Sequence, residues 1–562
     1  MGRNLGNGYH AYAAATTFKE DGWREKSDSK LTNAFIKFGR DTEKTSWNVS
    51  VMGGTSDLKG NGLAPHDMYT TNYRQGYTFY DITENKSQQI SFAGTHKLSN
   101  EEKLSLTTWY RHAKRKGNNG DVNENYREYL MDDGLVCSGR TLVSGEYTDV
   151  AHCEETAVIN RNTSTQKTYG VTLQWDRQLG AHKLLSGVTL QQAKTRYEQS
   201  QSDAEFNELR VAIVGSEGFT QQADHRGKNT QYAFYVGDIF TPSSDTLLSA
   251  ALRYDHAKVN NKLNNFDADG VQNETFNYSK LNPSFGASQK LNNQVTVFGN
   301  WSQGMRVPTA FELACSNPLK PCTVPTGLQD DPYLKPIISQ TAEIGFRLFP
   351  TEKTRVTVAA FSNINKDDVA FVRAPIQVGT LSQGIFQNIG KTQRDGVELT
   401  ARHRESKWEI GASYTYLRAR YKSNLELPSL EGEIDVTPGT RIAGLPEHFF
   451  KFAAMYRMSP QLRVGGDLQV FGNQVVAGNE TKNTTADDTQ DATGKDKLAG
   501  YGILNLNANY EYEKGLNFFV RVNNVFDKKY ASYATLGYNM FDGGSLARQA
   551  SDVEGSVFYA PG

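Results

Sequence analysis

The chain has 562 residues, including 28 Tyr, 28 Phe and 50 Gly, and its formal net charge is −1. This balance leaves no broad basic field that could hold nucleic acid. The mean hydropathy is −0.59, and no stretch approaches the roughly 18 apolar residues of a membrane helix. The composition is also uniform along the chain. It therefore favours one large repetitive architecture over several domains of about 100–200 residues each.

The first predicted elements are two strands near the start of the chain. One strand is expected over 8–18, and a turn at 21–27 joins it to a second strand over 31–40. The residues before them contain no apolar segment of the kind found in signal peptides. We therefore expect the sequence to be a mature fragment or an incomplete reading frame.

Apolar and polar residues alternate along most of the chain. In 461–470, one face carries Leu462, Val464, Leu468 and Val470, and the other carries Gln461, Arg463, Asp467 and Gln469. The segments 169–176, 231–238, 248–255, 504–510 and 516–523 show the same alternation. This pattern is typical of strands with one apolar and one wet face. Such strands can cross a bilayer with only every second residue apolar, so a low mean hydropathy is compatible with membrane strands.

The connections between the predicted strands alternate between short and long. Nine are tight turns, at 41–44, 99–102, 179–181, 242–245, 291–293, 350–353, 405–406, 459–460 and 513–515. The long polar stretches are 58–84, 116–165, 198–228, 260–276, 303–337, 366–382, 422–444 and 475–498. Short periplasmic turns and long extracellular loops are typical of outer-membrane barrels, whereas a propeller would repeat at about 40–45 residues. The predicted fold class is all-β, a large antiparallel transmembrane β-barrel.

The turns also predict the number of strands. Nine turns define eighteen strands, and the strand over 8–18 makes nineteen. Because bacterial single-chain barrels have even strand numbers, we expect a barrel that is truncated at both ends. In the full protein it would be of the 22-stranded type, roughly the size of plugged transporters. Residues 1–562 are then a single barrel domain.

Several motifs in the second half of the chain occur in the order of a known family. They are WSQGMRVPTAFE at 301–312, DPYLKP at 331–336, QTAEIG at 340–345, NIG at 388–390, GVE at 396–398, RIAGLPEH at 441–448, VNNVFDKKY at 522–530 and FYAPG at 558–562. Together they resemble the TonB-dependent outer-membrane receptors, with DGWR at 21–24 as a weaker match.

This resemblance implies energised uptake across the bacterial outer membrane, where lipid and lipopolysaccharide surround the barrel. It also implies a plug domain and a TonB box that contact the TonB–ExbB–ExbD complex. We expect both ahead of residue 1, since neither is present in the sequence.

Candidate ligand-binding residues lie in the aromatic stretch within 58–84. They are His66, Tyr69, Tyr73, Arg74, Tyr77 and Tyr80. Aromatic rings and arginine can hold a flat iron chelate by stacking and charge. The alternative is that these side chains pack the loops against one another. Arg306, in the first motif, either faces the ligand or braces the mouth of the barrel.

The four cysteines form two local pairs in predicted extracellular loops, Cys137 with Cys153 and Cys315 with Cys322. An oxidising exterior favours disulfides. Three connectivities are possible, and we expect the two local bonds together. The cluster at 152–155 matches no common zinc pattern, so we predict neither a bound metal nor a cofactor.

The leading functional hypothesis is a receptor and transporter for a ferric siderophore. Haem receptors of this family usually place a histidine between two of the motifs, and none occurs between Arg306 and Leu334. Haem is therefore less favoured, although His66, His152 or His225 could substitute. A cobalamin-like chelate receptor, a passive pore and a soluble β-rich binding protein remain alternatives. A barrel hydrolase would need a Ser–His pair on the outer wall; His112 and His256 lie in strands, but no matching nucleophile is indicated, so no enzyme is predicted.

Overall fold

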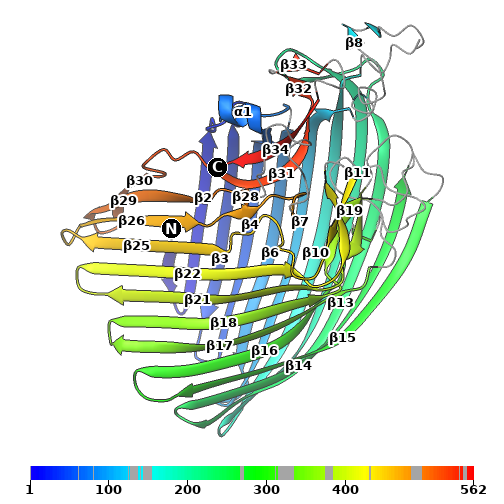
Figure 1. The fold of residues 1–562 in the computed structure, drawn as a ribbon. Helices are drawn as coiled ribbons and strands as arrows, with labels where there is room; N and C mark the ends of the chain where they lie inside the picture. The colour runs from blue at the N-terminus through cyan, green and yellow to red at the C-terminus, as the bar shows by residue number, and fades with distance from the viewer. Residues whose placement is uncertain are drawn as a thin grey trace.

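The computed structural model contains one large antiparallel sheet of 21 strands. It describes residues 2–60, 62–79, 81–123, 126, 137–138, 141–142, 155–265, 271–310, 312–313, 334–373, 384–429, 432–481, 497–542, 545–547 and 553–562. Each long strand pairs with the long strand before it and the one after it in the chain, as in a meander. The sheet curves into a wall, and the tight turns that join consecutive long strands lie along one edge of it (Figure 1).

Nineteen of these strands are long. They are β2 (Tyr9–Glu20), β3 (Ser29–Asp41), β4 (Thr45–Gly60), β6 (Asp81–Lys97), β7 (Glu102–Val122), β10 (Ala157–Leu179), β11 (His182–Phe206), β13 (Thr220–Ser243), β14 (Thr246–Asn265), β15 (Val271–Lys290), β16 (Val295–Arg306), β17 (Ile337–Thr351), β18 (Thr354–Lys366), β21 (Thr392–Arg404), β22 (Trp408–Tyr421), β25 (His448–Arg457), β26 (Leu462–Phe471), β29 (Tyr501–Glu513) and β30 (Leu516–Val522). The two short members are β1 (Gly2–Gly6) and β12 (Ala212–Val214). All nine predicted tight turns fall between consecutive long strands, so the prediction of nineteen strands is confirmed.

The short strand β1 was missing from the sequence-based prediction. It forms a hairpin with β2 in which Gly6 lies opposite Tyr9. The two residues between them, Asn7 and Gly8, have φ values of 51° and 80°. Positive φ at both positions of an Asn-Gly pair is the backbone of the tightest hairpin turn. The expectation that the sheet begins at residue 8 was therefore wrong.

The strands also extend further than predicted. Stretches predicted as the loops 116–165, 198–228 and 260–276 contain the ends of β10, β11, β13, β14 and β15. Above the membrane both faces of a strand meet water, so the apolar alternation that marks a strand in the sequence disappears there. Hydrogen bonding between neighbouring strands nevertheless continues.

One face of the sheet carries an unbroken apolar band. Leu173, Val188, Phe234, Tyr254 and Leu281 lie directly opposite one another on five consecutive strands. Phe234 and Tyr254 keep 52% and 46% of their surfaces exposed. Each such side chain left in water would forgo about 1.5–3 kcal/mol of burial free energy. The band is therefore the lipid-facing outer surface.

The opposite face is polar and hydrogen-bonded. Thr172 and Thr189 are joined across strands at 3.1 Å, and the Tyr235 hydroxyl donates to Gln174 Oε1 at 2.7 Å. This inner face carries the polar half of each alternating strand. Because it is wet, the barrel can surround an aqueous interior.

Smaller elements cover the loop end of the sheet. β5 (Ala64–Pro65) and β31 (Ala531–Asn539) both pair with β34 (Glu554–Pro561), and α1 (His66–Thr71) lies beside them (Figure 1). The remaining short hairpins are β8 (Cys137–Ser138) with β9 (Thr141–Leu142), β19 (Val369–Arg373) with β20 (Gly384–Asn388), β23 (Leu425–Ser429) with β24 (Gly432–Val436), β27 (Gln474–Val475) with β28 (Lys497–Leu498), and β32 (Phe541–Asp542) with β33 (Ser545–Leu546). In the described part of the chain, no helix is long and apolar enough to cross a membrane.

The two faces of the sheet can be tested with neighbouring residues of β21. Leu399 belongs to the outer band and is 38% exposed, whereas Thr400 faces the interior. We expect Leu399→Arg to make folding into lipid vesicles about 2–4 kcal/mol less favourable, because it places a charge in the bilayer. Thr400→Arg should change it by about 0.5 kcal/mol or less. Urea titration of the two variants in vesicles measures their free energies of unfolding. Equal losses of stability would contradict the assignment of the two faces.

Candidate functional site

An aromatic cluster lies at the loop end, where the segments after β2 and after β4 meet the chain after β30. Its rings belong to Trp23, Tyr69, Tyr73, Tyr77, Tyr530, Phe541, Phe558 and Tyr559. We call it the loop-end cluster. It joins segments that are almost 500 positions apart, since the Tyr73 hydroxyl contacts the carbonyl of Gly562.

Tyr73 lies at the centre of the loop-end cluster. Its ring stacks on Trp23 at 5.1 Å between centroids and meets Tyr69 edge-on at 5.4 Å. Its hydroxyl donates to the Tyr530 carbonyl at 2.9 Å and also contacts the carbonyl of Gly562. Both the ring and the hydroxyl of Tyr73 are therefore used in holding the loops together.

Tyr77 is held in a similar way. Its ring meets Phe541 and Phe558 edge-on, each at 5.1 Å, and its hydroxyl accepts the backbone N–H of Met540 at 2.8 Å. Two half-buried arginines fix the neighbouring backbone. Arg24 donates to the carbonyl of Gln75 at 2.7 Å, and Arg210 donates to that of Tyr77 at 2.9 Å. Burial lowers the pKa of both arginines below its usual value, which is the cost of placing these donors under the loops.

Tyr69 and His66 both pack against Tyr559. Tyr69 stacks on Tyr559 at 4.6 Å, and burial raises the pKa of its hydroxyl to about 12, so it stays a neutral phenol. His66 lies against the same Tyr559 ring at 5.9 Å, and its Nδ1 has no hydrogen-bond partner among the described residues. Both side chains are half-buried, and the Nδ1 atom of His66 is itself buried, so a ligand could reach only the remaining atoms of the two rings. Arg74 is exposed beside them.

Arg306 is engaged by its own motif. Its guanidinium lies 2.9 and 3.0 Å from the two carboxylate oxygens of Glu312. The same carboxylate accepts the backbone N–H of Thr309 at 2.7 Å, and Thr309 Oγ1 accepts the N–H of Glu312 at 3.0 Å. The RVPTAFE sequence thus closes a compact turn at the end of β16. This geometry agrees with a bracing role at the mouth of the barrel.

Some predicted site residues lie outside the described part of the chain. Tyr80, Cys153, Cys315 and Cys322 are among them, and for Cys137 only the backbone, in β8, is described. The two disulfides therefore remain predictions. Among the described residues there is no group of three or more His, Cys, Asp or Glu side chains that could hold a metal ion.

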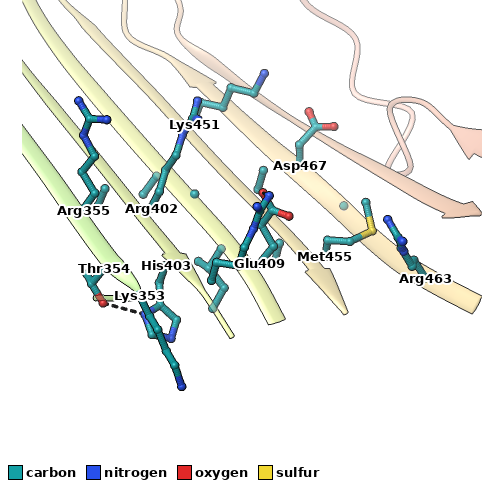
Figure 2. A pocket seen from close by; sticks show the side chains of 18 of the residues that line it. Lys353, Thr354, Arg355, Arg402, His403, Glu409, Lys451, Met455, Arg463 and Asp467 are labelled. Carbon is teal, nitrogen blue, oxygen red and sulfur yellow. Dashed lines mark hydrogen bonds and ion pairs between the residues drawn. The ribbon is translucent and has the colours of Figure 1, made fainter. Parts of the chain in front are cut away.

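A second feature is a concavity of about 1210 Å³ on the inner face near the turns (Figure 2). It is lined by polar side chains of β18, β21, β22, β25, β26, β29 and β30. Arg355 lies directly opposite Arg402, and Lys451 projects from β25 nearby. The sequence analysis assigned no function to these residues, although their places in the alternating pattern put them on the inner face.

Two of the carboxylates that line the concavity are paired with other residues. Asp467 accepts from Asn505 at 2.9 Å and lies 3.3 Å from Arg521, while Glu409 pairs with Arg404 at 2.8 Å. In the part of the chain that the structure describes, Arg355, Arg402 and Lys451 form no ion pair. The lining contains six Lys or Arg side chains and four Asp or Glu side chains, so the concavity presents net positive charge to the interior.

The outer wall does contain a serine opposite a histidine. Ser279 Oγ lies 2.8 Å from His256 Nδ1, a pairing that the sequence did not indicate. The same arrangement recurs at Thr45 with His96 and at Thr354 with His403, at 2.7 and 2.8 Å. These are cross-strand hydrogen bonds, and none of them includes the third, orienting group that hydrolytic triads use.

Comparison with known families decides the identity of this sheet. Residues 20–525 match the family described as TonB dependent receptor-like, beta-barrel. The chain belongs to the TonB-dependent receptor β-barrel family. It is an outer-membrane barrel, and its apolar outer band is the surface that such a location requires.

Two curated relatives match part of the chain. The ferrioxamine receptor of Yersinia enterocolitica is 25% identical over 368 residues, which are 63% of this chain and 45% of that protein. The catecholate siderophore receptor Fiu of Escherichia coli (strain K12) is 23% identical over 211 residues, 37% of this chain and 24% of Fiu. The chain thus spans less than half the length of these curated relatives.

Solved structures show the same fold. The crystal structure of Fiu in its closed form aligns with a TM-score of 0.70 at 14% identity, covering 100% of this chain and 77% of that one. The siderophore receptor PiuA from Acinetobacter baumannii aligns with a TM-score of 0.69 at 16% identity, covering 100% and 78%. The family and these neighbours are receptors and transporters.

Two variants separate the role of Tyr73 from that of the neighbouring Tyr69. Tyr73→Phe removes the donor to the Tyr530 carbonyl, so we expect it to weaken the loop-end cluster by about 0.5–1.5 kcal/mol. Amide hydrogen exchange in 553–562 should then become faster, by up to about tenfold. Tyr69→Phe is the matched control, because no hydrogen bond of its hydroxyl is described, and it should leave exchange unchanged. Equal effects of the two variants would contradict the role of the Tyr73 hydroxyl in holding the loops together.

Proposed function

We propose that this receptor takes up a ferric siderophore across the outer membrane. The observation that carries the proposal is a barrel wall with a wet inner face, in a chain whose relatives include receptors for ferrioxamine and ferric catecholates. The inner concavity of about 1210 Å³ is larger than the roughly 300–1,000 Å³ of most small-molecule sites. It is large enough for an intact chelate.

The loop end supports the entry step of this proposal. His66, Tyr69 and exposed Arg74 lie together on the segment that carries α1, next to the Tyr559 ring. They offer a stacking surface, a neutral phenol and a cation, which suit a chelate with aromatic or anionic groups. We propose that Tyr73 and Tyr77 position this surface, and that the surface contacts the ligand first.

Uptake of this kind needs a source of energy and a gate. We propose that the barrel works with a plug domain and with the TonB–ExbB–ExbD complex, as the family resemblance implies. In this scheme residues 1–562 supply the barrel domain and perform no chemical reaction. The protein lowers the barrier to passage and leaves the covalent structure of its ligand unchanged.

The substrate class can be tested by iron-limited growth. A strain that lacks its own siderophore receptors should grow on ferrioxamine or on a ferric catecholate when it carries this receptor, and should accumulate ⁵⁵Fe from that chelate. We also expect transcription of the gene to rise under iron starvation. Growth on haem or uptake of cobalamin without uptake of either chelate would contradict the assignment and leave the family membership intact.

The inner concavity makes a separate prediction about transport. The double variant Arg402→Gln with Lys451→Gln removes two unpaired cations from the wall. We expect it to slow uptake of an anionic ferric catecholate several-fold while binding of the chelate to cells stays unchanged, because entry occurs at the other end. Arg404→Gln is the control, since that charge is already paired with Glu409. Equal slowing by both variants would contradict a role for the free cations.

A further inference from the structure

The segment that follows β16 packs onto the inner wall of the barrel. Its residues Ala310, Leu313 and Leu334 are 8%, 0% and 1% exposed. They form one apolar cluster with side chains of β14 and β15, namely Ala257, Val259, Phe276 and Tyr278. These four strand positions alternate with the outward-facing Tyr254 and Leu281, so they face the interior. This part of the chain therefore lies inside the mouth of the barrel.

A histidine is enclosed where residues 306–310, 312 and 313, which we call the mouth turn, meet β13. His225 is 1% exposed, and its imidazole interacts with the Asn261 side chain and with the backbone of Ala310. Gly227 lies two residues further along β13, and a side chain there would place its Cβ 2.4 Å from the Cβ of Ala310. The glycine thus allows the turn to approach the strand closely. His225, a possible substitute haem ligand in the sequence analysis, is covered by the chain itself.

His225 lies outside the bilayer. Phe234 belongs to the apolar band, and His225 is nine residues away from it toward the loop end of β13. At about 3.3 Å per residue, the distance along the strand is roughly 30 Å. The proton that reaches His225 therefore comes from the extracellular medium.

The carboxylates nearest in sequence and on the mouth turn already have cationic partners. Asp224 precedes the histidine on β13, and its carboxylate lies 2.9 Å from Arg226 and 3.4 Å from Arg196. Glu312 of the mouth turn lies 2.9 Å from Arg306. These groups therefore do little to stabilise a charged imidazole.

The neighbouring strands present mainly neutral groups to His225. Tyr197 lies directly opposite on β11, and burial raises the pKa of its hydroxyl to about 12. Leu263 lies opposite on β14. On β15, Glu274 lies opposite Asn261, and burial raises the pKa of its carboxyl group, which favours the neutral acid. The surroundings of His225 thus suit a neutral imidazole.

Burial makes docking of the mouth turn sensitive to pH. It lowers the pKa of His225 from 6.5 to about 4, because the charged form loses its hydration there. When the turn leaves the wall, water reaches the side chain and its pKa returns towards 6.5. Proton binding therefore favours the released turn below pH 6.5 and has no effect well above it. As pH falls from about 6.5 to about 4, docking weakens by about tenfold per pH unit.

We propose that protonation of His225 releases the mouth turn from the inner wall, so that the mouth of the receptor opens more readily in mildly acidic surroundings. The apolar cluster restores the docked turn when the proton leaves. This switch belongs to the barrel and acts whichever chelate the receptor carries, so it does not depend on the proposed substrate.

Hydrogen–deuterium exchange of the intact receptor in lipid vesicles tests the proposal. The Leu313 backbone N–H donates to the Thr309 carbonyl at 3.1 Å, so a peptide that contains both residues reports on the mouth turn. Its exchange is measured at about pH 7.5 and about pH 5.5 and corrected for the intrinsic effect of pH on amide exchange. We expect the corrected rate of the wild type to be about tenfold higher at the lower pH.

Two histidine variants identify the group that titrates. His225→Gln keeps a polar side chain that does not titrate, so its corrected rate should be the same at both pH values, even if glutamine itself loosens the turn. His256→Gln is the matched control, since His256 is an outward histidine of β14 that contacts Ser279, and it should keep the tenfold change. A wild type that does not respond to pH, or a response that persists in His225→Gln, would overturn the proposal. Loss of the response in His256→Gln would do the same.

Discussion

The absence of water from the bilayer interior is the constraint on which this structure depends. Every backbone N–H and C=O at that depth must find a partner within the protein, since each unsatisfied group costs several kcal/mol. The receptor satisfies them between strands, in ladders that continue from β2 to β30. Once the backbone is committed to a sheet, side chains must alternate between lipid and interior. Both the apolar band and the polar wall follow from this alternation.

The same alternation gives the two faces different functions. Inward positions near the turns collect Arg355, Arg402 and Lys451, none of which forms an ion pair with another described residue. Outward positions collect the apolar band. The first set faces a route for solutes, and the second faces lipid. Neither set is continuous in sequence, since each strand contributes only a few residues.

Aromatic residues at the loop end act mainly through packing. Tyr73 and Tyr77 use their rings and hydroxyls to join the segment after β4 to the chain after β30. This leaves His66, Tyr69 and Arg74 as the members of the predicted set with atoms open to a ligand. Arg306 is occupied by Glu312. The aromatic-rich segment therefore contains both the proposed ligand-contacting surface and the tyrosines that hold this surface in place.

The sequence by itself determined the strands, their order and the end at which the turns lie. Period-two alternation and turn chemistry are local properties, so residues a few positions apart are sufficient to show them. The prediction failed where that local signal fades, as in the upper parts of β10 to β15, where both faces are wet. It also failed at Asn7–Gly8, where a single local turn was overlooked. Tertiary structure alone decided which tyrosines are used in packing and that Arg355 faces Arg402. Those outcomes depend on the register between strands, which is set by hydrogen bonds between residues far apart in the chain.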